Sequence, residues 1–153
     1  MRARELMSYP PVTCHVNDSL AEAAHLMWEH DCGALAVIND EGKLTSMITD
    51  RDICMAAYTQ GKPLEDMLVN SAMAKGVVTA APDDSVDDVE RLMAEHQLRR
   101  IPIVDAEHRP LGLVSLANLA LESIRPASHL KQGRVVHTLA SIDRPRPSDE
   151  KAM

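Results

Sequence analysis

Aromatic residues are what this sequence lacks most clearly. Its 153 residues include no phenylalanine, one tryptophan and two tyrosines. Proteins that bind single-stranded nucleic acid stack the bases on aromatic side chains, so that function is not expected here. Hydrophobic residues still make up 45% of the chain. The core must therefore be built mainly from Ala, Val, Leu, Ile and Met.

Long apolar runs and cysteine motifs are also missing. No apolar run approaches the roughly 20 residues of a membrane-spanning helix, and the N-terminal stretch MRARELMSYPP lacks the apolar centre of a signal peptide. The spacings between Cys14, Cys32 and Cys54 match no zinc motif. We therefore expect a reduced, cytoplasmic protein that has no membrane partner. Cys54 is expected to be a small core residue.

The net charge of −7 is unevenly distributed. Residues 1–124 hold 10 Lys/Arg against 20 Asp/Glu, whereas residues 125–153 hold 6 against 3. An acidic body of this kind disfavours a nucleic-acid partner. The basic extension contains three prolines, and its end, from about Asp143, is expected to be disordered. The preceding stretch SHLKQGRVVHTLASI predicts one short element, either a helix or a strand.

The sequence aligns with itself, without a gap, when it is shifted by 66 residues. This shift gives ten identities over 48 aligned positions, and the apolar positions stay in phase. The identical pairs are Met7/Met73, Val12/Val78, Thr13/Thr79, Asp18/Asp84, Ser19/Ser85, Leu26/Leu92, Met27/Met93, Glu29/Glu95, His30/His96 and Glu41/Glu107. Such a pattern indicates two copies of one supersecondary unit.

Each copy predicts the order strand, helix, strand, strand, helix. In the first copy these segments are PPVTCHV, NDSLAEAAHLMWEH, ALAVI, LTSMI and DRDICMAAYTQGK. The first helix has apolar residues at Leu20, Ala23, Ala24 and Met27, which form the stripe of an amphipathic helix. The second copy has GVVTAAP as its first strand, RIPIV and LGLVS as the next two, and LANLALESI as its last helix. Neither small sheet can bury its apolar face alone, so we predict an α/β fold in which the copies pack together.

A Thr-x-x-Asp pattern lies where the strand LTSMI meets the helix DRDICMAA. Thr49 and Asp52 could form a capping box, which contributes about 1 kcal/mol. They could also form a ligand site, because free N–H groups at a helix N-terminus attract phosphate. A carboxylate one turn inside the helix can accept hydrogen bonds from a ribose diol. Ser115 and Asn118 take the same places in the second copy.

The stretches SMITDRDI, RRIPIVD and LGLVSLAN resemble a tandem pair of cystathionine-β-synthase (CBS) domains, often called a Bateman module. The resemblance covers roughly residues 5–124. It implies two repeats packed pseudo-symmetrically, with small sheets and flanking helices, and a homodimer formed through the helices. It also implies an adenosine ligand in clefts between the repeats, such as AMP, ADP, ATP or S-adenosylmethionine, and sometimes NAD. In such modules the Thr/Ser faces phosphate, the Asp holds the ribose hydroxyls, and the base lies between aliphatic residues.

Two positions depart from the family pattern. Ser46 stands where Gly is usual in the first copy, and Asn118 stands where Asp is usual in the second. An Asn can still bond a ribose hydroxyl, but without a charge. The predicted nucleotide-binding residues are Thr13, Thr49, Arg51, Asp52, Thr79, Arg100, Ile101, Pro102, Ser115 and Asn118. Arg51 could instead be a solvated residue at the helix start, and Pro102 should mark a strand edge or strand start.

The resemblance implies a regulatory binding module rather than an enzyme. Its predicted parts are the first repeat with its N-terminal segment (1–66), the second repeat (67–124) and a partly disordered extension (125–153). The module would sense an adenosine nucleotide and act on a separate enzyme or transporter, and no metal is expected. Two alternatives stay open. One is a dimeric interaction module with degenerate sites, and the other is a metal or redox responder that uses the Cys and His residues.

Overall fold

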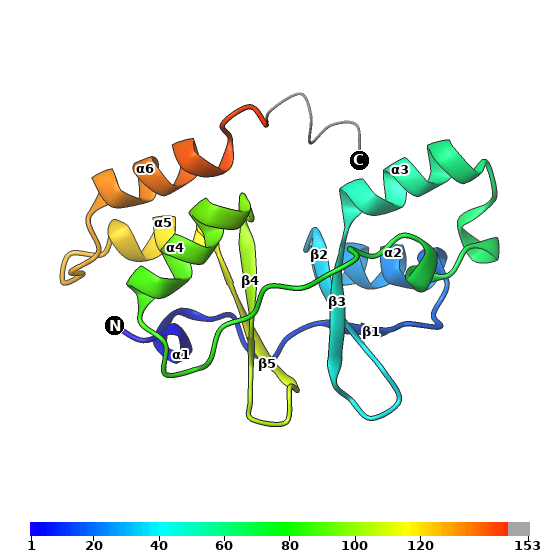
Figure 1. The fold of residues 1–153 in the computed structure, drawn as a ribbon, viewed down its shortest axis with the longest axis horizontal. Helices are drawn as coiled ribbons and strands as arrows, with labels where there is room; N and C mark the ends of the chain where they lie inside the picture. Colours follow the sequence, from blue (N-terminus) through cyan, green and yellow to red (C-terminus); the bar gives the residue numbers. More distant parts are fainter. Residues whose placement is uncertain (147–153) are drawn as a thin grey trace.

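The computed structural model describes residues 1–146 and shows two similar α/β units, with their strands toward the middle and their helices outside (Figure 1). The first unit consists of β1 (Thr13–His15), α2 (Leu20–Glu29), β2 (Ala34–Ile38), β3 (Leu44–Thr49) and α3 (Asp50–Gln60). The second consists of α4 (Val86–His96), β4 (Arg100–Val104), β5 (Pro110–Ser115) and α5 (Leu116–Ser123). The remaining helices are α1 (Ala3–Leu6), the 3-10 turns η1 (Leu64–Asp66) and η2 (Val69–Ser71), and α6 (Gln132–Ile142). The predicted α/β class and paired repeats are thus confirmed.

The two sheets differ in one strand. In the first unit β1 pairs in parallel with β2, which pairs antiparallel with β3. In the second unit only β4 and β5 form a sheet, and the predicted strand GVVTAAP contributes a single bridge, between Ala80 and Ile103. The repeat explains this difference. In the first unit the Val16 amide donates to the Ile38 carbonyl, and the Ala36 amide donates to the Val12 carbonyl. In the second unit Pro82 and Pro102 take the places of these two donors and have no N–H.

The backbone repeats at the same shift of 66 residues. Asp31 and Gln97 end equivalent helices with left-handed φ angles of 49° and 53°. Gly42 and His108 occupy equivalent hairpin turns with φ angles of 77° and 64°. Non-glycine residues rarely adopt this conformation, so its recurrence at matched positions supports two copies of one unit.

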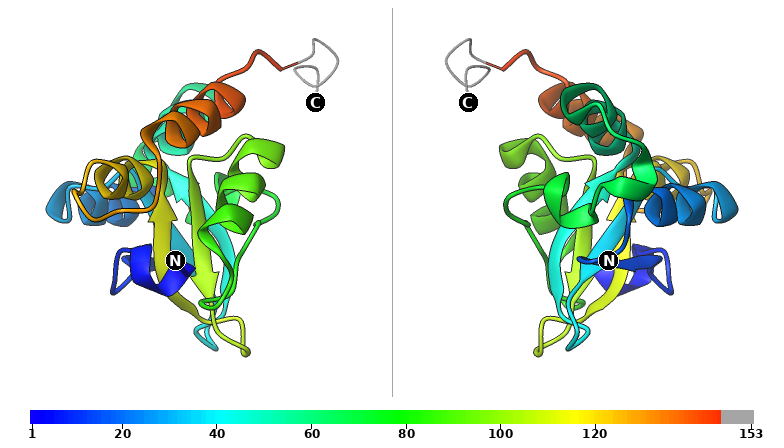
Figure 2. Two further views of the ribbon diagram at one scale, coloured as in Figure 1. Left: turned by 90° about the vertical axis from the view of Figure 1, so that its left-hand side faces the viewer. Right: turned by 90° about the vertical axis from the view of Figure 1, so that its right-hand side faces the viewer.

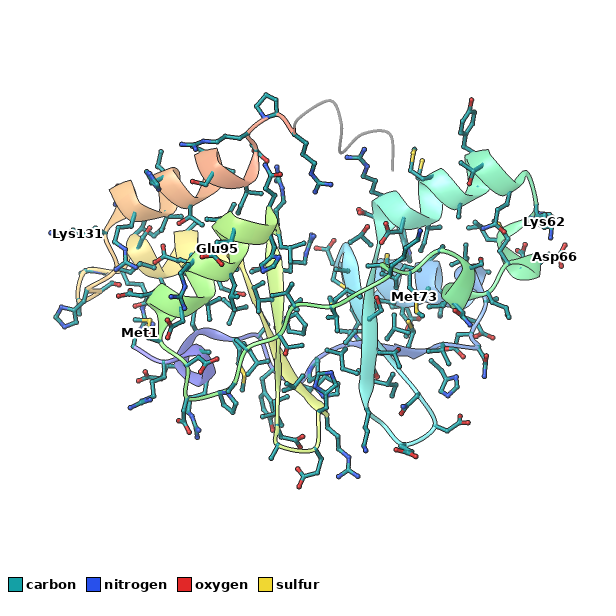
Figure 3. The ribbon with its side chains drawn as sticks, viewed as in Figure 1. Met1, Lys62, Asp66, Met73, Glu95 and Lys131 are labelled. Carbon is teal, nitrogen blue, oxygen red and sulfur yellow. The ribbon has the colours of Figure 1, made fainter. Side chains whose placement is uncertain are left out.

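The segment before each repeat crosses to the other unit. The amide of Ser8 donates to Leu113 of β5 at 2.8 Å, and the amide of Ala74, 66 residues later, donates to Met47 of β3 at 3.1 Å. Met7 accordingly packs against the core of the second unit, and Met73, labelled in Figure 3, packs against that of the first. The two units are therefore tied together by exchanged segments. The division into residues 1–66, 67–124 and 125–153 stays a prediction.

Each unit has its own aliphatic core, as the scarcity of aromatics predicts. Leu20, Leu35 and Ile48 are fully buried in the first core, and Met93, Ile101 and Val114 in the second. A third, smaller cluster lies between the units and consists of Ala36, Leu44 and Val104, with Met47 and Val77 packed against it.

The predicted element in the C-terminal extension is a helix. This helix, α6, packs against α4 and α5 (Figure 2) and buries Val135 and Ile142 in the second core. Arg134 pairs with Asp87 at 2.5 Å and also with Glu90, whose side chain is buried beneath α6. The predicted disorder falls mostly on residues 147–153, which lie outside the described residues.

Two smaller expectations have different outcomes. Pro102 lies in β4, a strand of the two-stranded sheet, and its carbonyl accepts a hydrogen bond from the Ala80 amide at 3.1 Å. The edge position expected for this proline is thus confirmed. The prediction that Cys54 is a core residue is wrong, because the apolar face of α3 is formed by Ile53 and Ala56 and Cys54 is exposed. No helix within residues 1–146 is long and apolar enough to span a membrane.

Candidate functional site

The Thr-x-x-Asp pattern forms a capping box at the start of α3. The Asp52 amide donates to Thr49 Oγ1 at 3.1 Å, and the Thr49 amide donates to Asp52 Oδ2 at 2.9 Å. Within residues 1–146 no hydrogen bond reaches the other carboxylate oxygen of Asp52, Oδ1. The cap therefore uses only half of this carboxylate.

The equivalent pair at the start of α5 is more fully engaged. Asn118 Oδ1 accepts from both the amide and the hydroxyl of Ser115, each at 2.8 Å. Asn118 Nδ2 donates to Ser8 Oγ at 3.2 Å. The neutral amide thus caps its helix and also anchors the crossing N-terminal segment.

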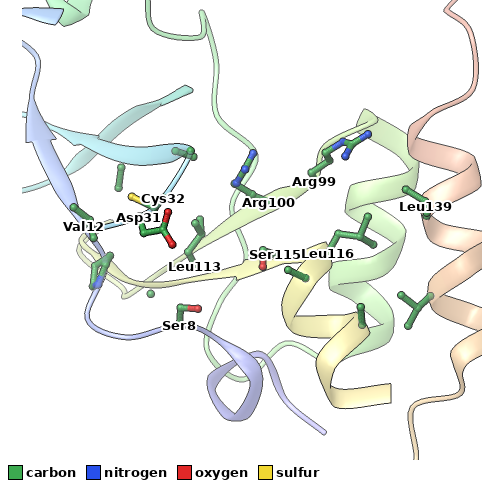
Figure 4. A pocket seen from close by; sticks show the side chains of 18 of the residues that line it. Ser8, Val12, Asp31, Cys32, Arg99, Arg100, Leu113, Ser115, Leu116 and Leu139 are labelled. Carbon is green, nitrogen blue, oxygen red and sulfur yellow. The ribbon is translucent and has the colours of Figure 1, made fainter. Parts of the chain in front are cut away.

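Two cavities lie between the units, one beside each helix start. The larger, about 780 Å³, includes Ser115 and is called the Ser115 cavity (Figure 4). Val12, Asp31 and Cys32 face it from the first unit, and Leu139 faces it from α6. Its other lining residues are Ser8, Pro10, Pro11, Gly33, Ala34, Ala36, Arg99, Arg100, Gly112, Leu113, Leu116, Ala117, Ala120, Val135 and Val136. This volume is in the usual range for a small-molecule site.

The smaller cavity, about 380 Å³, includes Thr49 and Asp52 and is called the Thr49 cavity. Its aliphatic wall comes from Met47 in β3 and from Val77 and Val78 in the linker between η2 and α4. The remaining lining residues are Ala34, Ala74, Gly76, Leu98, Arg99, Arg100, Pro102 and Arg146. It combines a helix start and a carboxylate with an arginine-rich wall.

Arg99 and Arg100 belong to both cavities. They occupy the positions that Gly33 and Ala34 hold in the first unit. The backbone hydrogen bonds agree with this equivalence, because the Gly33 carbonyl accepts from the Asp50 amide and the Arg99 carbonyl accepts from the Leu116 amide. The guanidinium of Arg100 lies so close to Gly33 that a Cβ there would be 3.3 Å from its Nη2. Small residues in one repeat thus leave room for the cations of the other.

The structure brings five of the ten predicted residues to the cavities. Thr49 and Asp52 line the Thr49 cavity together with Pro102, Ser115 lines the Ser115 cavity, and Arg100 lines both. The residues that line neither are Thr13, Arg51, Thr79, Ile101 and Asn118. Arg51 is exposed on α3, and Ile101 is buried in the second core. Whether any of the ten binds a ligand stays a prediction.

Sequence reasoning missed several lining residues. Asp31 and Cys32 follow the end of α2, and the sequence carries no motif that marks them as lining residues. Leu139 and Arg146 belong to the extension beyond the repeats, where the resemblance gives no guidance. Within residues 1–146, no three His, Cys, Asp or Glu side chains gather as a metal ion requires.

Comparisons with known proteins agree with this architecture. The sequence model of the CBS domain matches residues 3–58 and 67–124. The CBS domain-containing protein YhcV of Bacillus subtilis is 36% identical over 121 residues, which cover 79% of this chain and 84% of that protein.

Solved structures show the same likeness. The CBS domain pair of protein MJ0100, in complex with 5′-methylthioadenosine and S-adenosyl-L-methionine, superposes with a TM-score of 0.72 at 30% identity, covering 79% of this chain and 94% of that one. Hypoxic Response Protein I with two coordinated zinc ions gives a TM-score of 0.71 at 30% identity, covering 79% and 98%. The chain therefore belongs to the CBS domain family and contains a tandem pair of CBS domains.

Proposed function

We propose that this protein is a regulatory module that binds an adenosine-containing ligand between its two CBS domains. The observation that carries this proposal is the position of Thr49 and Asp52. They cap α3 and at the same time line a cavity between the units. A cap alone would not require a cavity beside it.

The chemistry of the Thr49 cavity suits a nucleoside. Asp52 Oδ1 is free of protein donors within residues 1–146 and could accept hydrogen bonds from a ribose diol. Met47, Val77 and Val78 supply an aliphatic wall for a base. The neighbouring arginines Arg99, Arg100 and Arg146 favour an anionic group.

The ligand class rests partly on a relative. The CBS pair of protein MJ0100 was solved with 5′-methylthioadenosine and S-adenosyl-L-methionine. We extend this class to AMP, ADP and ATP because the cavity has cationic side chains near a helix start. Binding would regulate a separate enzyme or transporter in the cytoplasm, and the module itself would not be an enzyme.

A thermal-shift experiment tests the proposal on the whole chain. AMP, ADP, ATP, S-adenosylmethionine and 5′-methylthioadenosine are each added up to millimolar concentration. A ligand present at 100 times its dissociation constant should add about 2.7 kcal/mol to the free energy of unfolding. If none of the five raises the melting temperature, and calorimetric titration also shows no heat, the proposal is wrong.

Exposed apolar side chains favour a second role as a dimeric interaction module. Trp28 on α2 and Tyr58 on α3 are 86% and 84% exposed, and Leu121 and Ile124 at the end of α5 are 64% and 65% exposed. Apolar surface of this kind commonly marks a protein contact. We expect a homodimer, which light scattering would detect as twice the chain mass of 16.8 kDa. A monomer at micromolar concentration would contradict this role.

A further inference from the structure

The C-terminal extension contributes a different kind of residue to each cavity. Helix α6 gives the Ser115 cavity three aliphatic side chains, namely Val135, Val136 and Leu139. Four residues beyond α6, Arg146 lies in the wall of the Thr49 cavity. One segment outside the CBS domains therefore makes the Ser115 cavity more apolar and the Thr49 cavity more cationic.

The segment that carries Arg146 is fastened to the second unit. Gln97 Nε2 donates to the carbonyl oxygens of Ile142, at 3.3 Å, and Arg144, at 2.9 Å. Arg99 pairs with Asp143 at 2.6 Å. Because these contacts hold Ile142, Asp143 and Arg144, which lie two to four residues before Arg146, they direct its backbone toward the cavity.

The fastening residues are specific to the second repeat. Gln97 stands where Asp31 stands in the first repeat, and Arg99 stands where Gly33 does. Asp31 lines the Ser115 cavity, whereas Gln97 is turned to the backbone of the extension. The two otherwise similar repeats therefore differ at the positions that bind this segment.

The wall of the Thr49 cavity is positively charged overall. It contains the three arginines Arg99, Arg100 and Arg146, against one carboxylate, that of Asp52. Asp143 partly neutralises Arg99. Within residues 1–146, neither Arg100 nor Arg146 has a carboxylate within 4.0 Å. Two guanidinium groups without such partners at one cavity suit a phosphate group, which arginine can bind through two parallel hydrogen bonds.

We infer that Arg146 and Arg100 form a phosphate subsite in the Thr49 cavity, so that this cavity selects a phosphorylated adenosine ligand. The inference rests on the proposed function for the nucleoside part, whereas the phosphate part rests on the arginines alone. Arg146 acts as a specificity-determining residue supplied from outside the CBS domains. Gln97 acts as its positioning residue.

The test uses the full chain and two probes, ADP and inorganic pyrophosphate, titrated by calorimetry and by nuclear magnetic resonance at constant ionic strength. Arg146→Ala should weaken ADP binding about tenfold and should weaken pyrophosphate binding similarly. Arg144→Ala is the matched control, because Arg144 lies two residues from Arg146 and carries the same charge. Its side chain lines neither cavity. This substitution should change both affinities less than about twofold. Methylthioadenosine, which has no phosphate, should bind both variants as it binds the unchanged protein.

The outcomes separate the two proposals. Equal losses in Arg146→Ala and Arg144→Ala would overturn the inference, because they would show only a general charge effect. Failure of both ADP and pyrophosphate to bind the unchanged protein would overturn it as well. If pyrophosphate binds in an Arg146-dependent way but ADP binds no more tightly, the phosphate subsite stands and the nucleoside proposal fails. Both variants should melt within about 2 °C of the unchanged protein, since both arginines are exposed.

Discussion

The hydroxyl group of Ser46 donates a 2.6 Å hydrogen bond to the carbonyl oxygen of Ala74, where the linker crosses β3. Ser46 is only 1% exposed. Gly112 holds the equivalent place in β5, and there the crossing N-terminal segment comes so close that a Cβ would lie 2.6 Å from Ser8 O. The linker thus contacts β3 through a side-chain hydrogen bond, whereas the N-terminal segment contacts β5 through close approach of the two backbones.

This difference predicts that substitutions at the two crossings lower the stability by unequal amounts. Gly112→Ala should lower the free energy of unfolding by about 1–3 kcal/mol, because the Met7–Ser8 segment must move to admit the methyl group. Ser46→Gly should cost only about 1 kcal/mol, which is the usual value of one hydrogen bond. Urea denaturation of both variants measures these changes. A Gly112→Ala protein as stable as the unchanged one would contradict the tight crossing.

The sequence predicted the paired repeats because their signal is carried by many residues at once. The 66-residue shift keeps helix stripes, capping residues and strands in phase, and the second copy was expected to match the first throughout. It does not match at its first strand, where prolines remove N–H groups that pair the strands of the first unit. The sequence alone does not show which N–H groups face the neighbouring strand, so this loss of pairing could not be predicted.

The site was predicted only in part. Thr49 and Asp52 could be predicted because they form a local pattern, a helix cap at a strand–helix junction, and this junction also lines the cavity. Thr13 and Thr79 were expected near the pocket, but the cavity walls are formed instead by the adjoining Val12 and Val78. Side chains alternate between the two faces of an extended segment, so an error of one residue reverses the face. The contribution of Arg146 depends on tertiary contacts of the extension, which no local pattern encodes.

Truncation should separate the two parts of the C-terminal extension. Among the contacts of residues 144–146, a chain that ends at Asp143 loses the exposed hydrogen bond between Gln97 and Arg144, so we expect its melting temperature to fall by less than about 3 °C. A chain that ends at Lys131 also loses α6, including the buried Val135 and Ile142. Burial of such side chains contributes about 1.5–3 kcal/mol each, so a fall of roughly 10 °C or more is expected. Calorimetry of both chains decides this, and a similar large fall in both would show that residues 144–153 are packed.

The three cysteines should react with iodoacetamide at different rates. Burial, with a smaller effect of the Asp18 charge, raises the pKa of the Cys14 thiol to about 12, so this residue should stay unmodified in the folded protein. Cys54 is exposed and should react first. Cys32 lines the Ser115 cavity, so a ligand bound there should slow its alkylation while leaving Cys54 unchanged. Peptide mass spectrometry with and without 5′-methylthioadenosine measures both rates.

The raised pKa of Cys14 also predicts how stability changes at high pH. The thiol has a pKa near 9.0 when the chain is unfolded and about 12 when it is folded. Because the folded pKa is the higher one, the contribution of Cys14 to stability is fully present below pH 9 and is lost as the pH rises from 9 toward 12. Denaturation of Cys14→Ala across this range should show a shallower decline than the unchanged protein. Parallel declines would contradict the assignment.

Asp52 and Asn118 should differ in their effect on ligand binding. Asp52 lines a cavity and has a carboxylate oxygen free of protein donors within residues 1–146, whereas Asn118 lines neither cavity and bonds Ser8 and Ser115. Hydrogen bonds to a charged group contribute about 1.5–3 kcal/mol, so Asp52→Ala should weaken AMP binding tenfold or more. Asn118→Ala should lower stability by about 1 kcal/mol through its lost cap and leave affinity nearly unchanged.

Asp52→Asn provides the matched control for this comparison, because an amide oxygen can still accept the Thr49 amide while the charge is removed. Its stability should therefore stay within about 0.5 kcal/mol of the unchanged protein, while its affinity for AMP falls toward that of Asp52→Ala. Calorimetric titration and urea denaturation of the three variants give both quantities. If Asp52→Ala and Asn118→Ala lose stability equally and neither changes the affinity, both residues are only helix caps. If Asn118→Ala loses more affinity than Asp52→Ala, the ligand depends on the second helix start, and the assignment of the ribose to Asp52 is wrong.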